Sequence, residues 1–373
     1  MVRLFDQFRM IFPDPKVQGL VLCALVSTAM VGVVLSLDPA PRGGNIERKV
    51  AASESMELAI KALRENYLSR GFQFDDTVDP NHTALVGVEY SDMVTTLGSA
   101  DAKRSTTNPN VAGLVVQLLI EAGVKQGDTI AVGCSGSFPA LAVATLAATK
   151  TLGVHPVIVL SLGSSSFGAD RVDWTLLDIL GLLKSKHLVD VSFAGVSLGG
   201  AADVGNDFEP ETRKMLAEKM NLSGIPIINE PDLVRNVARR MGIYFGATGA
   251  RGIAAFVNIG GSQADLGIDP IILKLEPGVN RQITLPEKEE RYGVVFAMAK
   301  RHIPVVYLLH IKGLMLKYGL PWDPTPLPSV SAEDVSQPHS ALNASLVAAM
   351  SLYFFLILMI FILYRRKLLR TSS

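Results

Sequence analysis

Two long runs of apolar residues stand near the two ends of the chain. Residues 17–37 (VQGLVLCALVSTAMVGVVLSL) and 344–364 (ASLVAAMSLYFFLILMIFILY) contain no charged side chain. Each run has about the length that a helix needs to cross a bilayer. A buried core helix is the alternative for either run, but a charge-free run of this length favours a membrane span. The pattern therefore predicts a transmembrane helix at each end of the chain.

The alternative for the first run is a cleaved signal peptide. The run is longer than the usual apolar part of such a peptide, and no A-x-A cleavage site is obvious. Cys23 loosely suggests a lipoprotein site, but bulky Leu22 precedes it and most of the apolar run follows it. We therefore favour an uncleaved anchor.

Basic residues flank the two runs on the sides that face away from the body of the chain. Three precede the first run, at positions 3, 9 and 16, and four follow the second run within residues 365–373. Those at positions 42, 48 and 49 weaken this asymmetry without reversing it. Because basic residues gather on the cytoplasmic side of a membrane, we expect both termini in the cytoplasm and the body outside.

Between the spans, short apolar runs rich in β-branched residues alternate with helical patterns. Amphipathic spacing indicates helices after Asn108-Pro109, over residues 209–220 and from residue 229 onward. Short buried strands alternating with helices are typical of a mainly parallel sheet with helices on both faces. We predict an α/β fold of this kind, flanked by one N-terminal and one C-terminal transmembrane helix. The predicted strands are 129–133, 156–162, 189–198, 225–228, 253–259 and 304–310.

Two segments link this body to the predicted spans. Residues 46–70 carry apolar side chains at helical spacing, which predicts a helix that rises from the membrane as a stalk. A Pro-rich polar segment before the second span is typical of an extended tether. The predicted order is a cytoplasmic N-terminus (1–16), a transmembrane helix (17–37), the stalk (38–74), an extracytoplasmic α/β domain (75–320), the tether (321–343), a transmembrane helix (344–364) and a basic cytoplasmic tail (365–373).

Glycine-rich turns follow four of the predicted strands. They read VGCSGS (132–137), SLGSSSFGAD (161–170), VSLGGAADVG (196–205) and VNIGGSQADLG (257–267). Ligands of parallel α/β sheets bind where strands end, and glycines let backbone amides approach them closely. The alternative is that glycines only turn tight corners, but the shared composition favours a rim that faces a ligand. The candidate ligand-binding residues are Gly133, Gly136, Ser137, Gly199, Gly200, Gly260, Gly261 and Ser262, with Lys103, Arg104 and Arg251 as cations in adjoining polar turns.

Charge and composition exclude several classes of protein. The chain has 35 basic and 35 acidic residues, but its two tails hold seven of the basic and two of the acidic ones. The body is therefore mildly acidic, the opposite of what a nucleic-acid binder needs. Two cysteines, Cys23 and Cys134, provide neither a disulfide framework nor the spacing of a zinc site. Without a P-loop, a dinucleotide fingerprint or an H-E-x-x-H motif, we predict no cofactor and no metal.

Ser135 lies in a partial match to the nucleophile elbow of serine hydrolases. Residues 133–137 (GCSGS) fit four positions of G-x-S-x-G and place a serine where the last glycine belongs. A nucleophilic serine needs a base, and His310 follows a late predicted strand. Asp265 or Asp203 would then orient that base. The alternative, which we favour, is that Ser135 or Ser137 caps the following helix or holds a ligand.

Longer stretches of the chain resemble one known family. Residues 95–148, which contain STTNPN and SGSFPA, together with SLGSSSFGAD, NEPDLVRNVARRM, VNIGGSQADLG and YGLPWDPTPLP, are similar to the poly-γ-glutamate system protein family. The resemblance covers nearly the whole chain, including both apolar runs. It implies a part in making, exporting or trimming the γ-linked glutamate polymer of some bacterial envelopes, at the cytoplasmic membrane. It implies no particular catalytic residues.

We therefore predict an accessory protein of poly-γ-glutamate synthesis or export that binds at its glycine-rich face. The expected partners are the polymer or a glutamate-containing ligand, other membrane proteins of the same system and the lipid bilayer. The polymer is a polyanion and the body is mildly acidic, so any contact with it must be local. One alternative is a membrane-tethered serine amidase or transpeptidase that acts on the γ-glutamyl chain through Ser135. Another is a scaffold whose glycines are only structural.

Overall fold

The computed structural model describes residues 14–36, 45–248, 252–331 and 344–371. The chain divides into two compact units, one made of residues 1–42 and 338–373 and the other of residues 43–337. Several parts of the predicted order lie outside the described residues. These are residues 1–13 and 372–373 of the predicted cytoplasmic ends, residues 37–44 at the end of the first predicted span and the start of the stalk, and residues 332–343 of the tether. The candidate cation Arg251 also lies outside them.

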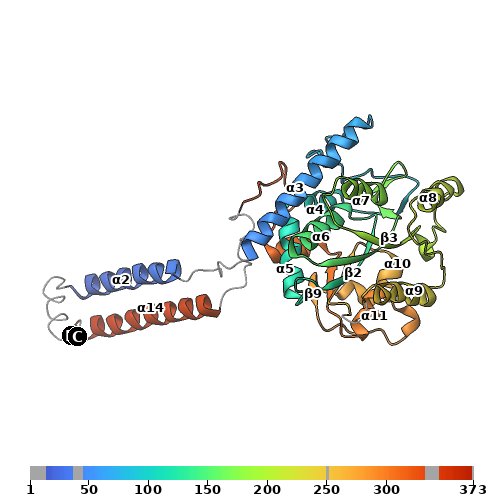
Figure 1. Ribbon diagram of the computed structural model, residues 1–373. Coiled ribbons are helices and arrows are strands. Elements are labelled where there is room, and N and C mark those ends of the chain that lie inside the picture. Colours follow the sequence, from blue (N-terminus) through green and yellow to red (C-terminus); the bar gives the residue numbers. More distant parts are fainter. Residues whose placement is uncertain (1–13, 37–44, 249–251, 332–343, 372–373) are drawn as a thin grey trace. The chain divides into compact units, whose positions relative to one another are not determined.

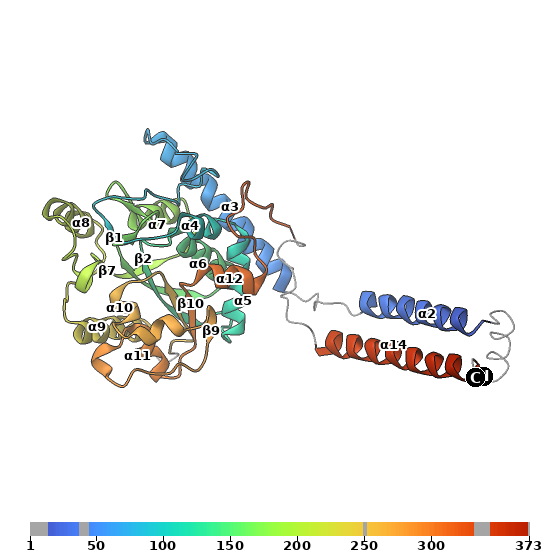
Figure 2. The same ribbon diagram turned by 180° about the vertical axis from the view of Figure 1, so that it is seen from behind.

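The first unit contains two helices, α2 (Pro15–Ser36) and α14 (Ala344–Thr371), which lie side by side (Figures 1 and 2). Ser27 Oγ on α2 lies 3.0 Å from the hydroxyl of Tyr353 on α14. In the described part of the chain, α2 alone is long and apolar enough to cross a membrane, over Lys16–Val33. A signal sequence meets the same criterion. The apolar stretch found in α14, Val347–Leu363, is shorter, so a second span remains a prediction.

The second unit is built on a six-stranded sheet with the order β7-β3-β2-β8-β10-β9. Five neighbouring strands run parallel, and the edge strand β9 runs antiparallel to β10. This confirms the predicted α/β body with a mainly parallel sheet. The strands are β2 (Thr129–Ser135), β3 (His155–Ser161), β7 (Ser192–Ser197), β8 (Phe256–Ile259), β9 (Gly278–Asn280) and β10 (Val305–Leu308).

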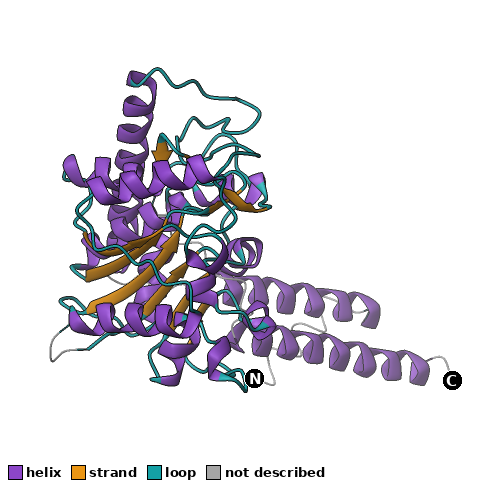
Figure 3. Cartoon of the chain, turned by 90° about the vertical axis from the view of Figure 1, so that its right-hand side faces the viewer, coloured by secondary structure: helices purple, strands orange, loops and turns teal. Residues whose placement is uncertain are grey.

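Helices cover both faces of this sheet (Figure 3). Successive residues of a strand point to opposite faces. On β2, Ile130 and Val132 therefore join the core under α3, α5, α6 and α7, whereas Ala131 joins the core under α9 and α11. The helices are α3 (Asn45–Ser69), α4 (Ala100–Thr106), α5 (Asn110–Glu121), α6 (Pro139–Leu152), α7 (Leu176–Ser185), α8 (Pro210–Leu222), α9 (Leu233–Gly246), α10 (Gln263–Leu266), α11 (Val294–Lys300) and α12 (Ile311–Tyr318).

Short strands outside the main sheet fix the loops above it. β1 (Val94–Thr96) pairs in parallel with β4 (Ser164–Ser165), so the segment before α4 lies beside the turn that follows β3. β5 (Asp170–Arg171) and β6 (Trp174–Thr175) form an antiparallel pair next to it.

Helix α3 belongs to the α/β body rather than standing apart from it as a stalk. The apolar stripe that the sequence predicts is buried, with Met56 and Leu63 fully enclosed. This stripe packs against α5 and α6. An amphipathic helix of this length gains most of its stability from such packing, which explains why it docks on the helices that cover the sheet.

One predicted strand does not form. Residues 225–228 contact β7 only through a single bridge between Val196 and Ile227. Pro226 has no amide hydrogen to donate to a ladder with β7, so the pairing does not extend beyond this bridge. The predicted strand over 189–198 is also shorter, since β7 spans Ser192–Ser197.

The strand order creates a gap at the carboxyl edge of the sheet. From β2 the chain moves outward to β3 and β7, then returns across the sheet to β8 and β10 on the other side of β2. The connections that leave β2 and β8 therefore turn in opposite directions. In open α/β sheets, ligands bind at such a switch point, outside the carboxyl ends of the strands.

Candidate functional site

A pocket of about 420 Å³ opens at the switch point, and we call it the strand-end pocket. Residues that follow β2, β3, β7, β8 and β10 all contribute to its wall. The segment of residues 95–99 and Lys103 of α4 close another side. The lining residues are Thr95, Thr96, Leu97, Gly98, Ser99, Lys103, Ser135, Ser137, Phe138, Ser161, Gly163, Ser165, Gly199, Gly200, Ala201, Asp207, Gly261, Ser262, Gln263 and Leu309.

All four predicted glycine-rich turns reach this pocket, although not every predicted residue lines it. Ser137, Gly199, Gly200, Gly261, Ser262 and Lys103 do, and so does Ser135. Gly133, Gly136, Gly260 and Arg104 stand outside the lining.

The glycines that stand outside the lining let the turns approach one another. A Cβ added to Gly133 would lie 2.7 Å from the carboxylate of Asp265. Gly260 has a φ of +82°, and a Cβ there would collide with Ser135 Oγ. A side chain at either position would push the turns apart. These glycines therefore shape the pocket without facing it.

Lys103 is buried under the pocket, although the sequence suggests a cation in a polar turn. It lies on α4 and is only 2% exposed. Its Nζ lies 3.6 Å from the centre of the Phe138 ring, donates to the carbonyl oxygen of Ser137 and lies 2.8 Å from Ser165 Oγ. Burial lowers the pKa of Lys103 to about 7, against the opposing attraction of Asp170. Burial thus favours the uncharged form of this amine.

Asp170 is the carboxyl group that acts most on Lys103. It is fully buried, and its Oδ1 accepts a hydrogen bond of 3.1 Å from the amide of Val88. Its Oδ2 has no hydrogen-bond partner in the described part of the chain. Burial raises the pKa of Asp170 to about 7, although backbone hydrogen bonds and Lys103 lower it. Burial therefore moves the pKa values of Lys103 and Asp170 toward neutrality from opposite sides.

The three predicted catalytic residues lie in different surroundings. Ser135 lines the pocket, and its Oγ accepts a long hydrogen bond of 3.4 Å from the amide of Ser137. His310 is exposed, precedes α12 and is not part of the lining. Asp265 is buried and accepts from Ser262 Oγ at 2.7 Å. The described residues contain no hydrogen bond that joins Ser135, His310 and Asp265 into a triad.

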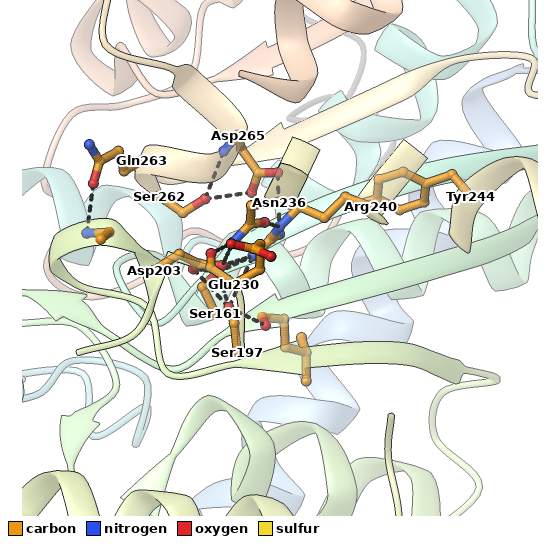
Figure 4. Close-up of polar contacts among 12 residues, drawn as sticks. Ser161, Ser197, Asp203, Glu230, Asn236, Arg240, Tyr244, Ser262, Gln263 and Asp265 are labelled. Carbon is orange, nitrogen blue, oxygen red and sulfur yellow. Dashed lines mark hydrogen bonds and ion pairs between the residues drawn. The ribbon is translucent and has the colours of Figure 1, made fainter. Parts of the chain in front are cut away.

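A buried polar network under the pocket engages Asp265 and Asp203 instead (Figure 4). Its centre is Arg240 of α9, which is fully buried. The guanidinium donates to Asp203 at 2.7 Å and lies 3.5 Å from Asp265. It also donates to Ser161 Oγ and Ser197 Oγ, each at 3.0 Å, and to Asn236 Oδ1 at 2.9 Å.

This network positions the floor of the pocket. It joins the ends of β3 and β7, the turn after β7, helix α9 and the turn before α10. Ser161 and Ser262 belong both to the network and to the pocket lining. Burial raises the pKa of Asp265, whereas Arg240 and the Ser262 hydroxyl lower it. One buried cation thus faces two carboxyl groups, and their hydrogen bonds hold the turns in place.

Arg104 holds the segment that follows α12. Its guanidinium pairs with Asp323 at 2.6 Å and with Asp101 at 2.8 Å. Asp323 belongs to the first part of the predicted tether, so this part packs on α4.

Sequence reasoning did not select several residues that the structure places at the site. Ser165 lies in the glycine-rich turn SLGSSSFGAD (161–170), and its place in that turn was the sequence signal that could have identified it as a pocket residue. Asp207 and Gln263 also line the pocket and fix its wall, since they accept from the amides of Ala201 and Ala202, each at 2.8 Å. Arg240 had no such signal, because a charged residue in an amphipathic helical pattern is usually solvated.

No cluster of three or more metal-ligating side chains occurs among the described residues. No family model matches the chain, and no curated protein or solved structure matches it either.

Proposed function

We propose that this chain is a membrane-anchored, extracytoplasmic accessory protein of bacterial poly-γ-glutamate synthesis or export. In this proposal it binds the polymer, or a glutamate-containing part of a partner, in the strand-end pocket. The observation that carries the proposal is the convergence of four glycine-rich strand ends on one pocket at the switch point of the sheet.

The chemistry of the pocket suits a γ-glutamyl segment better than a simple anion. Hydroxyl groups of Ser135, Ser137 and Ser99 line it, as do the backbones of Gly200 and Gly261. The amides of Gly200 and Gly261 have no hydrogen-bond acceptor within the described part of the chain. A γ-glutamyl chain offers carboxylates and carbonyls to such donors, and its own amide N–H groups can donate to hydroxyl oxygens.

Charge alone does not explain the proposed binding. The lining contains one buried lysine and one carboxylate, Asp207, so it carries no excess of positive charge. Affinity would then come from hydrogen bonds at short range, which fits a mildly acidic body that offers the polymer no long-range attraction.

The two helices of the first unit support the proposed anchoring. Large apolar side chains are exposed on both, with Leu20 at 71% and Phe354 at 63%. Exposed apolar surface of this extent indicates a membrane or a partner. Ser27 Oγ of α2 lies 3.0 Å from the hydroxyl of Tyr353 on α14, and polar contacts of this kind are typical of paired membrane helices. We propose two spans with both termini in the cytoplasm, because the basic residues lie outside both apolar runs.

The proposal is tested by titrating the full-length protein in detergent with purified poly-γ-glutamate. The informative variant is Gly261→Phe, because a Cβ at this position has no neighbour closer than 3.7 Å and the side chain would fill the pocket. The matched control is Gly242→Phe on the exposed face of α9, where no atom lies within 4 Å of an added Cβ.

We expect Gly261→Phe to weaken polymer binding at least tenfold with an unchanged Tm, and Gly242→Phe to bind like the wild type. The proposal fails if the wild type does not bind the polymer, or if Gly261→Phe binds it equally well.

A further inference from the structure

Lys103 and Ser165 form a close polar pair in the wall of the strand-end pocket. Lys103 Nζ and Ser165 Oγ are 2.8 Å apart, and both residues line the pocket. They come from separate elements, α4 and β4, which the pairing of β1 with β4 brings together. The arrangement is therefore a product of the fold and not of local sequence.

The backbone around Ser165 holds its side chain in a defined direction. Its amide donates to Ser137 Oγ at 3.1 Å, and β4 pairs with β1 on its other side. Since a hydroxyl carries one proton, Ser137 Oγ can accept from Ser165 and still donate to an oxygen atom in the pocket.

Lys103 lacks the partner that a purely structural buried lysine needs. Its Nζ forms no ion pair with a carboxylate in the described residues, and its contacts are the Ser137 carbonyl, the Ser165 hydroxyl and the Phe138 ring. A buried ammonium without a paired carboxylate is costly, so lysines at such positions lose their proton readily. An uncharged amine has a free electron pair that can accept the proton of a neighbouring hydroxyl.

We propose that Ser165 is a nucleophile and Lys103 its general base, which makes the strand-end pocket the active site of an amide hydrolase. The γ-glutamyl amide as the substrate rests on the proposed function. Water is the only co-reactant.

The reaction balances with these two side chains. Ser165 Oγ attacks the amide carbonyl carbon while its proton passes to the Nζ of uncharged Lys103. The carbon–nitrogen bond then breaks, and the ammonium of Lys103 returns this proton to the leaving amine. A water molecule attacks the resulting ester, gives one proton to Lys103 and releases a carboxylic acid. Lys103 finally returns that proton to Ser165 Oγ.

This assignment differs from a triad of Ser135, His310 and Asp265. His310 is exposed and stands outside the pocket lining, and Asp265 is engaged with Ser262 and Arg240. Lys103 already contacts a hydroxyl in the pocket. Ser165 thus has a base within hydrogen-bond reach, whereas the hydroxyl of Ser135 contacts the amide of Ser137 in the described part of the chain.

The pH dependence of the reaction follows from the state of Lys103. Asp170 is the carboxyl group whose charge acts on Lys103. Arg104, the residue next to Lys103 on α4, forms ion pairs with Asp101 and Asp323 instead. Since the pKa of Lys103 is lowered to about 7, the rate rises with pH through a midpoint near 7.

The first experiment treats the full-length protein in detergent with a fluorophosphonate probe and measures the rate of labelling. We expect Ser165→Ala and Lys103→Met to lower this rate by about 10³-fold, and Lys103→Met to remove the pH step. The matched control is the neighbouring Ser166→Ala, which changes a buried hydroxyl that has no partner in the described residues and lies outside the pocket lining. This control should label like the wild type.

Folding and an alternative nucleophile are checked in the same series. Circular dichroism and Tm report whether each variant folds. Ser165→Cys supplies a second test, because its reaction with iodoacetamide should show the same pH step near 7 and lose it when combined with Lys103→Met. The assignment is overturned if the wild type is not labelled, or if Ser135→Ala abolishes labelling while Ser165→Ala does not.

A second experiment separates this inference from the proposed function. Wild type and Ser165→Ala are mixed with poly-γ-glutamate, and binding and polymer chain length are measured. We expect both proteins to bind the polymer and only the wild type to shorten it. Binding without shortening overturns the hydrolase and leaves the proposed function standing. Labelling of Ser165 without polymer binding supports the nucleophile and overturns the polymer as its substrate.

Discussion

Lys103 and Arg240 are both buried cations, but they differ in the groups that compensate their charge. Arg240 faces two carboxyl groups and three further acceptors. Desolvation lowers the pKa of Arg240, but the attraction of Asp203 and Asp265 raises this pKa by more than desolvation lowers it. The guanidinium therefore stays charged. Among the described residues Lys103 Nζ forms no ion pair with a carboxylate, and burial lowers its pKa to about 7. The first cation therefore stabilises the site, whereas the second is suited to proton transfer.

Replacing Arg240 should destabilise the protein strongly. Arg240→Met leaves Asp203 and Asp265 buried without their cation, which typically costs about 3–5 kcal/mol. Urea unfolding of the full-length protein measures this change. The matched control is Arg239→Met, since Arg239 is exposed and its main contact is a hydrogen bond to the carbonyl of Ile227. An equal decrease in the free energy of unfolding in the two variants would show that the buried network contributes nothing to stability.

Lys103 should make stability depend on pH above neutrality. Its pKa is lowered to about 7 in the folded protein, whereas that of an unfolded lysine is about 10.4. Between these values the unfolded state binds more protons, so the free energy of unfolding rises with pH by up to about 1.4 kcal/mol per pH unit.

The comparison with Lys103→Met isolates this contribution, because Asp170, with a raised pKa of about 7, acts mainly below pH 7. Urea unfolding at pH 7, 8 and 9 should show the wild type gaining stability relative to the variant. A constant difference across this range would mean that Lys103 is charged in the folded protein.

The hydrophobic pattern of the sequence predicted most of the strands in the sheet. Five of its six strands come from predicted apolar runs, because strands buried on both faces leave a clear signal. The run 225–228 failed at Pro226, and the edge strand β9, with only three residues, had no comparable signal. The stripe of α3 was predicted correctly, but its packing partner was not, because a pattern shows which face is buried and not what covers it.

The sequence predicted where the pocket lies, but it did not predict the contact between Lys103 and Ser165. The glycine-rich strand ends are visible in the sequence because the fold class fixes where strand ends meet. The contact between Lys103 and Ser165 spans 62 residues and depends on the pairing of β1 with β4. Strands as short as these carry no readable period, so no sequence pattern could bring the two residues together.

The docking of α3 predicts that its buried stripe stabilises the whole α/β body. Leu63 is fully buried in the main core, and Leu63→Ala should lower the free energy of unfolding by about 2–5 kcal/mol. Leu58 lies on the same helix and is 57% exposed, so Leu58→Ala should change stability by less than about 0.5 kcal/mol. Equal, small effects in urea unfolding would indicate a stalk that is independent of the body.

For the whole molecule, the proposed anchoring makes a prediction about topology. Two spans with both termini in the cytoplasm would shield a tag placed after residue 373 from protease added to intact cells. A protease site inserted after Leu222, an exposed residue at the end of α8, should be cut in the same cells. Cleavage of the terminal tag in intact cells would contradict the proposed topology.

The proposed role in the polymer system predicts distinct effects of removing the protein from cells. Loss of a binding or export component lowers the amount of polymer, whereas loss of a hydrolase alters its chain length more than its amount. Cells that carry Ser165→Ala should therefore show altered chain length, and cells that carry Gly261→Phe should show both changes. These outcomes are measured by quantifying the polymer and sizing it by gel filtration.

A γ-glutamyl chain bound in the strand-end pocket should be visible in a structure of the full-length Ser165→Ala variant with a short γ-glutamyl oligomer. We expect oligomer density between Ser137 and Gly261, with an amide carbonyl carbon next to residue 165. Density for the oligomer elsewhere on the body, or an empty pocket at saturating oligomer, would contradict this expectation.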